Sequence, residues 1–428
     1  MTDNNITHKK NRLLRWSWFP SLFFGDGMVV SVLLLSMVML HRFGVGNTLA
    51  TIYLSLMCLP FMLRPLLEMA VAHFKGTTKV WILSAGFISA LSLWAIAFIL
   101  PTNYWLQGTM CLMPFVMVFG TLYNIAMERF YVDIPSASYT RQSKFALLFR
   151  CISLLFGIGA VTMLAGNMEV VTRNVRYSWS VVFYLMAGIE FFMWLWHSIF
   201  LPSQKQKELS ETDTFGLNGT DYNAAIDSLT QGWRNRFKLY FFMLFILPEA
   251  IMAFMQPLFL IDAPHNGGLG LSPQEYGLTF GTIAVIAVGA GSMAGSYAIN
   301  RLGLTRCIIP ASIILMAHGA TMLYLSNNIA AQLTVTSLVL FAGNMSFGIG
   351  LAACTSIVNR FAAAIKGHIF RRAVALSLMW TTVIATNIFC GMLQENIGYR
   401  QFFLIVMATY IVTIISASIY AYIFRKAV

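Results

Sequence analysis

The sequence predicts an all-α membrane protein with twelve transmembrane helices, on three observations. Hydrophobic residues make up 58% of the chain and charged residues only 10%, and the mean hydropathy is +0.71, values far outside the soluble range. The apolar residues gather in runs of about 20, the length that a helix needs to cross the hydrocarbon core. Alternating strands are absent, and backbone groups find no water in lipid, so we expect these runs to be helices.

The predicted spans cover almost the whole chain. The basic, polar start is followed by an apolar run that is too long for a signal peptide and has no small-residue cleavage pattern, so we expect a retained first helix. Indole rings near predicted helix ends, such as Trp105 and Trp179, support the bounds. The spans are 16–40, 48–72, 79–100, 105–127, 144–166, 178–201, 239–261, 276–299, 305–325, 331–357, 373–393 and 401–424.

The basic residues predict that both termini are cytoplasmic. Of the 28 Lys and Arg residues, 22 lie in tails and loops on the side of the N-terminus, and two, Arg64 and Arg150, lie within helices. The opposite loops hold only Arg42, Arg173, Arg176 and Arg400. By the positive-inside rule, the net charge of +12 therefore reports topology and not nucleic-acid binding.

An internal repeat predicts two related six-helix halves in the same orientation. Asp26 and Glu249, 223 residues apart, each lie 11 residues after a basic residue at the mouth of the first helix of a half. Two further pairs follow in the same order, Gly76 with Gly303 and Arg129 with Arg360, 227 and 231 residues apart. The longest polar segment lies between the halves, so we predict an N-terminal bundle (1–201), a cytoplasmic linker (202–238) and a C-terminal bundle (239–428).

Three stretches carry a family resemblance. "LPEAIMAF" at 247–254 and the Gly-rich loop after it resemble a seventh helix and its outer loop, and "FFGDGM" resembles a Phe-x-Glu-Gly motif with Asp26 at the acidic position. "YNIAMERFYVD" resembles the end of a fourth helix, with Asn124 and Met127 at two positions that are usually acidic. On these residues and the repeat, the chain resembles the major facilitator superfamily, and within it the AmpG-like muropeptide permeases and the related acetyl-coenzyme A and siderophore importers. The resemblance implies transport by alternating access, with helices 1, 4, 7 and 10 around a central cavity.

Asp26 and Glu249 are the leading candidates for proton coupling or substrate binding. A carboxylate at the bilayer centre costs about 2.5–3.5 kcal/mol on insertion scales, so each needs compensation. In the implied architecture both border the central cavity at matching places. Partial desolvation there favours the neutral acid, which makes either one a candidate proton carrier. The alternative is a structural carboxyl group that is permanently protonated or hydrogen-bonded.

Arg150, Asn124 and Asn344 are further candidates for this site. Arg150 lies on helix 5, and its planar guanidinium suits an anionic substrate or a buried carboxylate. The alternatives are a structural pair with Glu128 or a side chain that reaches the cytoplasmic face. Asn124 and Asn344, on helices 4 and 10, could donate hydrogen bonds into the cavity, although an Asn between membrane helices often only joins them.

A second group of residues suggests a cytoplasmic gate. Arg64 and Glu68 lie four apart on helix 2 and can satisfy each other, so we expect a mainly structural pair that could act as a latch. Glu128, Arg129 and Arg360, at the ends of helices 4 and 10, are assigned to the same gate.

Three other features have no assigned function. Glu190 on helix 6 has no partner that the sequence identifies, and His318 stands alone in helix 9. Gly291 and Gly295 form a small-x-x-x-small pattern, which predicts tight helix packing.

We therefore predict a proton-coupled secondary transporter that imports a small amphiphilic solute such as a muropeptide. A siderophore importer and a proton-driven drug or metabolite exporter are the alternatives. We expect a monomer in the bacterial inner membrane whose partners are the lipid bilayer, the solute and protons, without cofactor, metal or nucleic acid. An enzyme is disfavoured because no His-rich helix, paired Cys or Gly-x-Ser-x-Gly turn is found. A sensor would need a signalling domain, and the only sizeable polar segment is the linker.

Overall fold

The computed structural model describes residues 18–73, 77–132, 139–202, 226–227, 229, 231–363 and 368–424, and it leaves out the side chains of residues 131–145 and 368. All regular elements in these ranges are helices. Ten of them are long and apolar enough to cross a membrane, and a bent pair of shorter helices brings the number to eleven. The predicted all-helical membrane architecture is thereby confirmed.

The helices of the N-terminal half follow the first six predicted spans. The second span is bent by 40° between α4 and α5, and the fifth contains a π-helical turn, η1. The elements are α2 (Trp18–Arg42), α3 (Asn47–Met57), α4 (Leu59–Met62), α5 (Arg64–His73), α6 (Thr78–Ile99), α7 (Trp105–Val132), α8 (Tyr139–Leu154), η1 (Leu155–Ala160), α9 (Val161–Thr172) and α10 (Val175–Phe200).

The first helix of the C-terminal half begins earlier than predicted. It is α12, which starts at Trp233 and so extends into the predicted linker 202–238. Residues 203–225 of that linker lie outside the described ranges. The elements are α12 (Trp233–Ile261), the 3₁₀ turn η2 (Pro264–Asn266), α13 (Pro273–Leu278), the π-helical turn η3 (Thr279–Ala284), α14 (Val285–Leu302), α15 (Leu304–Asn327), α16 (Leu333–Ala363) and α17 (His368–Phe424).

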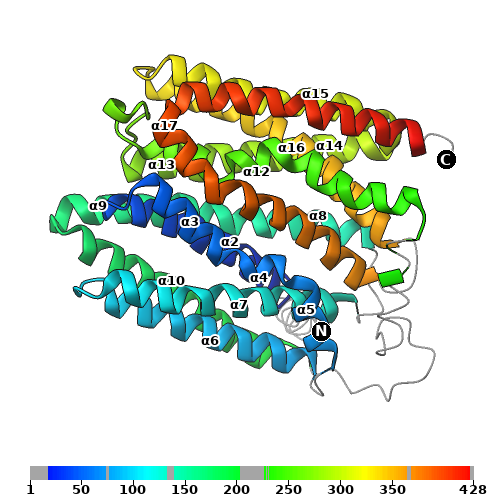
Figure 1. Ribbon diagram of the computed structural model, residues 1–428. Helices are drawn as coiled ribbons and strands as arrows, with labels where there is room; N and C mark the ends of the chain where they lie inside the picture. The colour runs from blue at the N-terminus through cyan, green and yellow to red at the C-terminus, as the bar shows by residue number, and fades with distance from the viewer. Residues whose placement is uncertain are drawn as a thin grey trace, which may run out of the picture.

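The last two predicted spans form the single element α17, which is broken at Gly398. This residue has φ 76° and ψ 164°, a conformation that only glycine adopts without strain. Unbroken, 57 residues would extend about 85 Å at 1.5 Å per residue, far more than a bilayer is thick. The break turns the chain back, and Figure 1 shows the two limbs of α17 in orange and red.

The two halves lie against each other with their helices roughly aligned. Most helices of residues 18–200 occupy the lower part of Figure 1 and most of those of residues 233–424 the upper part, while the orange limb of α17 runs down across them. The first helix, α2, begins and the last, α17, ends at the same end of the molecule. We call it the inner end, in keeping with the charge distribution, and the opposite end the outer end.

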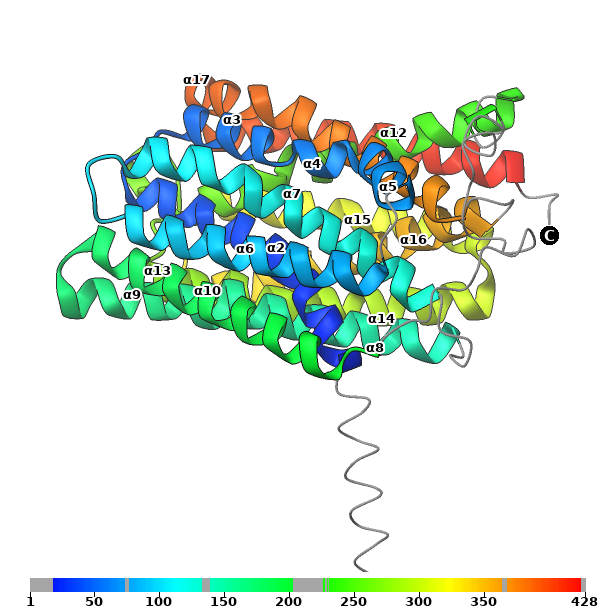
Figure 2. The same ribbon diagram turned by 90° about the horizontal axis from the view of Figure 1, so that it is seen from below.

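The halves meet mainly along two seams, with a further contact of α12 on α2. At the first, α17 packs along α3, α4 and α5, and α3 lies beside α17 in both views (Figures 1 and 2). At the second, which we call the π-helix seam, η1 packs on η3, with α9 on α13 and α8 on α14. π-Helical turns are rare and gather at functional sites, so two that face each other mark this seam as a specialised contact.

The predicted close packing at Gly291 and Gly295 is confirmed. A Cβ atom added to Gly291 would lie 2.0 Å from the backbone oxygen of Met345, and one added to Gly295 would lie 2.9 Å from Cβ of Ala352. Both contacts are with α16, so the small residues allow α14 and α16 to approach each other closely.

Replacing Gly291 with Ala is expected to destabilise the protein by about 1–3 kcal/mol, because the clash with a backbone atom forces the two helices apart. The matched control is Gly188→Ala on α10, where an added Cβ meets nothing within 4 Å. That change should be neutral or mildly stabilising, since Ala favours a helix more than Gly does. Thermal unfolding of the purified variants in detergent tests both expectations, and equal melting temperatures would contradict them.

Candidate functional site

Asp26 and Arg150 form an ion pair inside the N-terminal half. Arg150 Nε, on α8, donates a hydrogen bond to Asp26 Oδ2, on α2. The guanidinium also lies over the ring of Phe23, 5.6 Å from its centroid. The Asp26 side chain is 11% exposed and that of Arg150 34%. A buried carboxylate was one of the predicted partners of Arg150, and this carboxylate is Asp26 and not Glu128.

Glu249 lies in a different environment, within the C-terminal half. It accepts a hydrogen bond from the Tyr410 hydroxyl, 2.7 Å from Oε1, and its Oε2 lies 2.8 Å from Nδ1 of His318. All three side chains are buried, on α12, α17 and α15. His318 is, as predicted, the one histidine of its helix, but the sequence could not show that α15 turns it toward Glu249 on α12. Asp26 thus faces a cation, whereas Glu249 faces two groups that can share protons.

Charged residues near the inner end form a second group, the inner-end cluster of Arg64, Glu68, Glu128, Arg129 and Arg372. Arg64 Nη2 lies 3.0 Å from Glu128 Oε2, and Arg129 Nη2 lies 2.5 Å from Glu68 Oε1. The predicted pair of Arg64 with Glu68 is therefore wrong, because each finds its partner on α7. An ion pair four residues apart on one helix contributes only about 0.2–0.5 kcal/mol, so a well-placed partner on a packed helix can replace it.

The inner-end cluster also joins the two halves. Arg372, on α17, lies 3.7 Å from Glu128 Oε1, on α7. Nearby, the Ser377 hydroxyl donates to the backbone oxygen of Met62, and the rings of Phe61 and Trp380 stack with centroids 4.6 Å apart. Arg372 was not among the residues predicted for the gate. Arg360 is exposed near the end of α16 and takes no part in these pairs.

Several buried amides have polar atoms without a partner. Asn344 Nδ2 donates to the Leu340 oxygen of its own helix, 2.9 Å away. Asn124 Oδ1 is buried and, among the described residues, has no hydrogen-bond partner. The same holds for Gln256 Nε2 and for Oδ1 of Asn387, a residue whose Nδ2 donates to the Ala250 oxygen on α12. Substrate binding by Asn124 and Asn344 remains a prediction.

A polar network ties the halves together at the outer end. Its centre is Asp262, the residue after α12. Asn47 Nδ2 and the Tyr399 hydroxyl donate to Asp262 Oδ2, over 2.9 and 3.1 Å, and His41 Nε2 lies 3.5 Å from Oδ1. Asn47 also donates to Gln394 Oε1, 2.9 Å away. We call these five residues the outer-end network. All of them except Tyr399 line a cavity of about 490 Å³ that also includes Glu395.

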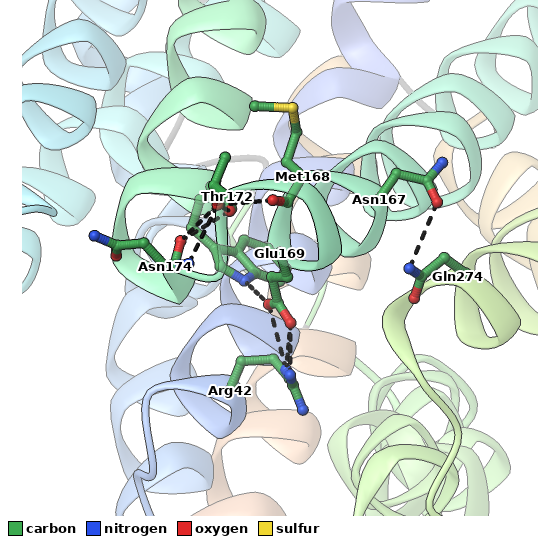
Figure 3. Close-up of polar contacts among 9 residues, drawn as sticks. Arg42, Asn167, Met168, Glu169, Thr172, Asn174 and Gln274 are labelled. Atoms are coloured by element: carbon green, nitrogen blue, oxygen red, sulfur yellow. Dashed lines mark hydrogen bonds and ion pairs between the residues drawn. The ribbon is translucent and has the colours of Figure 1, made fainter.

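The outer end of the π-helix seam carries a further contact between the halves. Gln274 Nε2, before η3, donates to Asn167 Oδ1 on α9 over 3.5 Å (Figure 3). Beside it, Glu169 is held within the N-terminal half by Arg42, whose Nη2 lies 2.5 Å from Glu169 Oε2 (Figure 3). Sequence reasoning missed these residues and the outer-end network, because polar residues at helix ends look like ordinary loop residues.

The Asp262 carboxyl group is held ionised. Burial opposes its ionisation, but hydrogen bonds outweigh burial and hold its pKa well below the usual range. The donors are His41, Asn266, Asn47 and the backbone N–H of Ala263. Opening the network would return the pKa toward the ordinary value of about 4. Ionisation of Asp262 therefore stabilises closure at neutral pH, and this contribution is lost as the pH falls from about 4 toward the depressed pKa of the closed form.

Acid is therefore expected to open the outer end, and Asp262→Asn should open it at all pH values. Spin labels can be placed at Val171 and Asn396, exposed residues near the outer ends of opposite halves. Double electron–electron resonance then measures the distance between the two labels, with the exposed Cys111 replaced by Ser so that it is not labelled. We expect a longer distance below about pH 4 than at neutral pH. Glu169→Gln is the control, because Glu169 bonds only within its own half. Unchanged distances in Asp262→Asn would contradict the assignment.

Comparison with solved structures shows what fold this is. The nucleoside transporter NupG superposes with a TM-score of 0.68 and 14% identity over 94% of this chain and 98% of its own. A bacterial homologue of the human lysosomal transporter Spinster, in an inward-facing and unoccupied conformation, superposes with a TM-score of 0.65 and 13% identity over 96% of each chain. No protein-family model matches the sequence, and no curated protein does. The chain thus shares the fold of these two solved transporters.

Proposed function

We propose that the protein is a secondary transporter that moves a small solute across a membrane by alternating access. The observation that carries the proposal is that breakable polar contacts join the halves at both ends. Asp262 and Asn47 meet across the outer end, and Arg372 and Glu128 across the inner end. Alternating access requires each of these contacts to open while the other stays closed, and hydrogen-bonded pairs can exchange with water at a modest net free energy.

The proposed architecture has twelve spans in two six-helix bundles, with both termini in the cytoplasm. Ten long helices and the bent pair provide eleven spans, and the break of α17 at Gly398 provides one more. The two bundles rock against each other along the two seams. The basic inner end faces the cytoplasm by the positive-inside rule.

Asp26 is the proposed coupling residue. While ionised it holds Arg150. A proton on Asp26 removes that negative charge and leaves the guanidinium free to bind another oxyanion. Proton uptake and solute binding would thus be linked at one arginine. Glu249, bonded to His318 and Tyr410, is the proposed second proton acceptor.

The charges favour an anionic solute. The Arg150 guanidinium, which is 34% exposed, is the group that a proton on Asp26 would release, and its planar fork suits a carboxylate or phosphate. An anionic amphiphile such as a muropeptide, taken up with protons, fits this site and the family resemblance. A siderophore importer is the alternative of the same charge, and an exporter would use the same pair in the reverse direction.

Uptake into proteoliposomes tests the proposal. We expect a labelled muropeptide to accumulate when the lumen is alkaline relative to the outside, and to stop accumulating when a protonophore collapses the gradient. A siderophore and a nucleoside serve as comparison solutes, the latter because NupG is a nucleoside transporter. Uptake of the muropeptide that ignores the pH gradient would rule out proton coupling. Transport of only the nucleoside would overturn the proposed solute but not the transport mechanism.

A further inference from the structure

A small cavity lies inside the N-terminal half, apart from the Asp26–Arg150 pair. Its volume is about 30 Å³, and it is bounded by residues of α2, α6, α7 and α10. Its polar lining comprises Ser89 on α6, Tyr123 on α7, and Glu190, Trp194 and His197 on α10. We call it the Glu190 pocket. The proposed transport mechanism makes no use of it.

Two polar atoms of the pocket are unsatisfied. Within the described ranges, neither Glu190 Oε2 nor Ser89 Oγ has a hydrogen-bond partner of good geometry, although both atoms are buried. The Ser89 hydroxyl lies close to the Glu190 carboxyl group and makes at most a poorly aligned hydrogen bond with it. Ser89 is only 4% exposed. A buried polar group without a partner costs about 1–3 kcal/mol, so two of them facing one cavity indicate that something occupies it.

The other polar groups of the pocket are already engaged. The Tyr123 hydroxyl donates to the backbone oxygen of Leu22, 3.4 Å away, and His197 Nε2 lies 2.9 Å from Ser21 Oγ. They are therefore not available to complete the hydrogen bonds of Glu190. The Trp194 indole also lines the pocket but does not satisfy Glu190 Oε2, which has no partner among the described residues, so a small polar occupant from outside the chain fits the pocket.

The charges around Glu190 restrict what the occupant is. No Lys or Arg lines the pocket. The titratable groups that face it are Tyr123 from α7 and His197 from α10, whereas α6 contributes Ser89 and α2 contributes Gly25 and Val29. Asp26, on α2, acts electrostatically on Tyr123 and is paired with Arg150. An ionised carboxylate in apolar surroundings without a cation is strongly disfavoured, and such groups usually take up a proton.

We propose that the Glu190 pocket is a proton-binding site, in which the Glu190 carboxyl group holds one proton and a single water joins it to Ser89. A water needs about 10–15 Å³, so the cavity is large enough for one. On binding, one carboxylate oxygen gains an O–H bond and the hydronium ion that supplies the proton becomes water. The pocket would give the N-terminal half a second titrating carboxyl group that stays separate from the arginine pair.

Infrared difference spectroscopy of the purified full-length protein tests this site without any transported solute. We expect a carbonyl-stretch band of a protonated carboxyl group that shifts in heavy water. Glu190→Gln should remove that band, and Asp26→Asn should retain it. Ser89→Ala should shift the band, because the bridging water loses one of its partners.

Two results would overturn the proposal. The first is a band that persists unchanged in Glu190→Gln; if that variant fails to fold, an unshifted band in Glu190→Asp has the same meaning. The second is a melting temperature that rises when sodium chloride replaces choline chloride at fixed pH, if this rise is absent in Glu190→Gln. That outcome would assign the pocket to a metal cation instead of a proton.

Discussion

Replacing Asp26 with Asn is expected to abolish proton-driven accumulation of the solute while preserving exchange of solute across the membrane. The amide has nearly the same shape and keeps an oxygen that Arg150 Nε can reach. The amide cannot take up a proton, so the contact between residue 26 and the Arg150 guanidinium no longer changes with pH. Gradient-driven uptake and solute counterflow, measured on the same proteoliposomes, separate the two activities.

The reverse change, Arg150→Met, is expected to damage the protein itself. It leaves the Asp26 carboxylate mostly buried, with 11% of its side chain exposed, and without its cation. Removing one partner of a buried pair costs about 3–5 kcal/mol, and the partial exposure of Arg150 places the expected loss at the lower end. Because the neutral pair leaves no buried charge, the double variant Asp26→Asn with Arg150→Met should recover much of the stability.

The matched control for both changes is Glu169→Gln, which also neutralises a carboxylate paired with an arginine but lies away from the proposed coupling site. Its accumulation ratio should stay close to that of the unaltered protein. Normal proton-driven accumulation by Asp26→Asn would show that coupling does not depend on this carboxylate. The proton acceptor would then have to be sought at Glu249.

The helices were largely predictable from the sequence, because their lengths follow from the thickness of the bilayer. Span 105–127 corresponds to α7 and span 305–325 to α15, with ends that differ by a few residues. The bend before α5 and the π-helical turns η1 and η3 were not predicted. Such irregularities depend on what packs against a helix, and hydrophobic periodicity carries no record of that.

The candidate site was predictable in its residues but not in its pairings. Hydrophobic surroundings singled out Asp26, Glu249 and Arg150, since intramembrane charges are costly. Which charge meets which depends on the rotation of each helix about its axis. Glu249 therefore acquired two partners on α15 and α17 that lie 69 and 161 residues away in the chain. Local spacing suggested that Arg64 pairs with Glu68, and the partners on α7 overrode it.

The π-helix seam leads to the second large expected effect. A Cβ atom added to Gly281, in η3, would lie 2.5 Å from the Cα and N atoms of Gly159, in η1. These are backbone atoms, so no change of side-chain rotamer relieves the clash. Gly281→Val is therefore expected to force the halves apart along this seam.

The separation should favour the conformation that is open at the outer end, because α9 and α13 meet on the outer side of the same seam. Overpacking of about 1–3 kcal/mol corresponds to a shift of roughly 5- to 150-fold in the equilibrium between the two conformations. Transport should fall by a similar factor, since a transporter held in one conformation cannot complete its cycle.

The control Gly188→Val, where an added Cβ meets nothing within 4 Å, should transport normally. Spin labels at Val170 and Leu278, exposed residues on α9 and α13, should move apart in Gly281→Val only. An unchanged distance together with normal transport would mean that the contact between η1 and η3 need not close during the cycle.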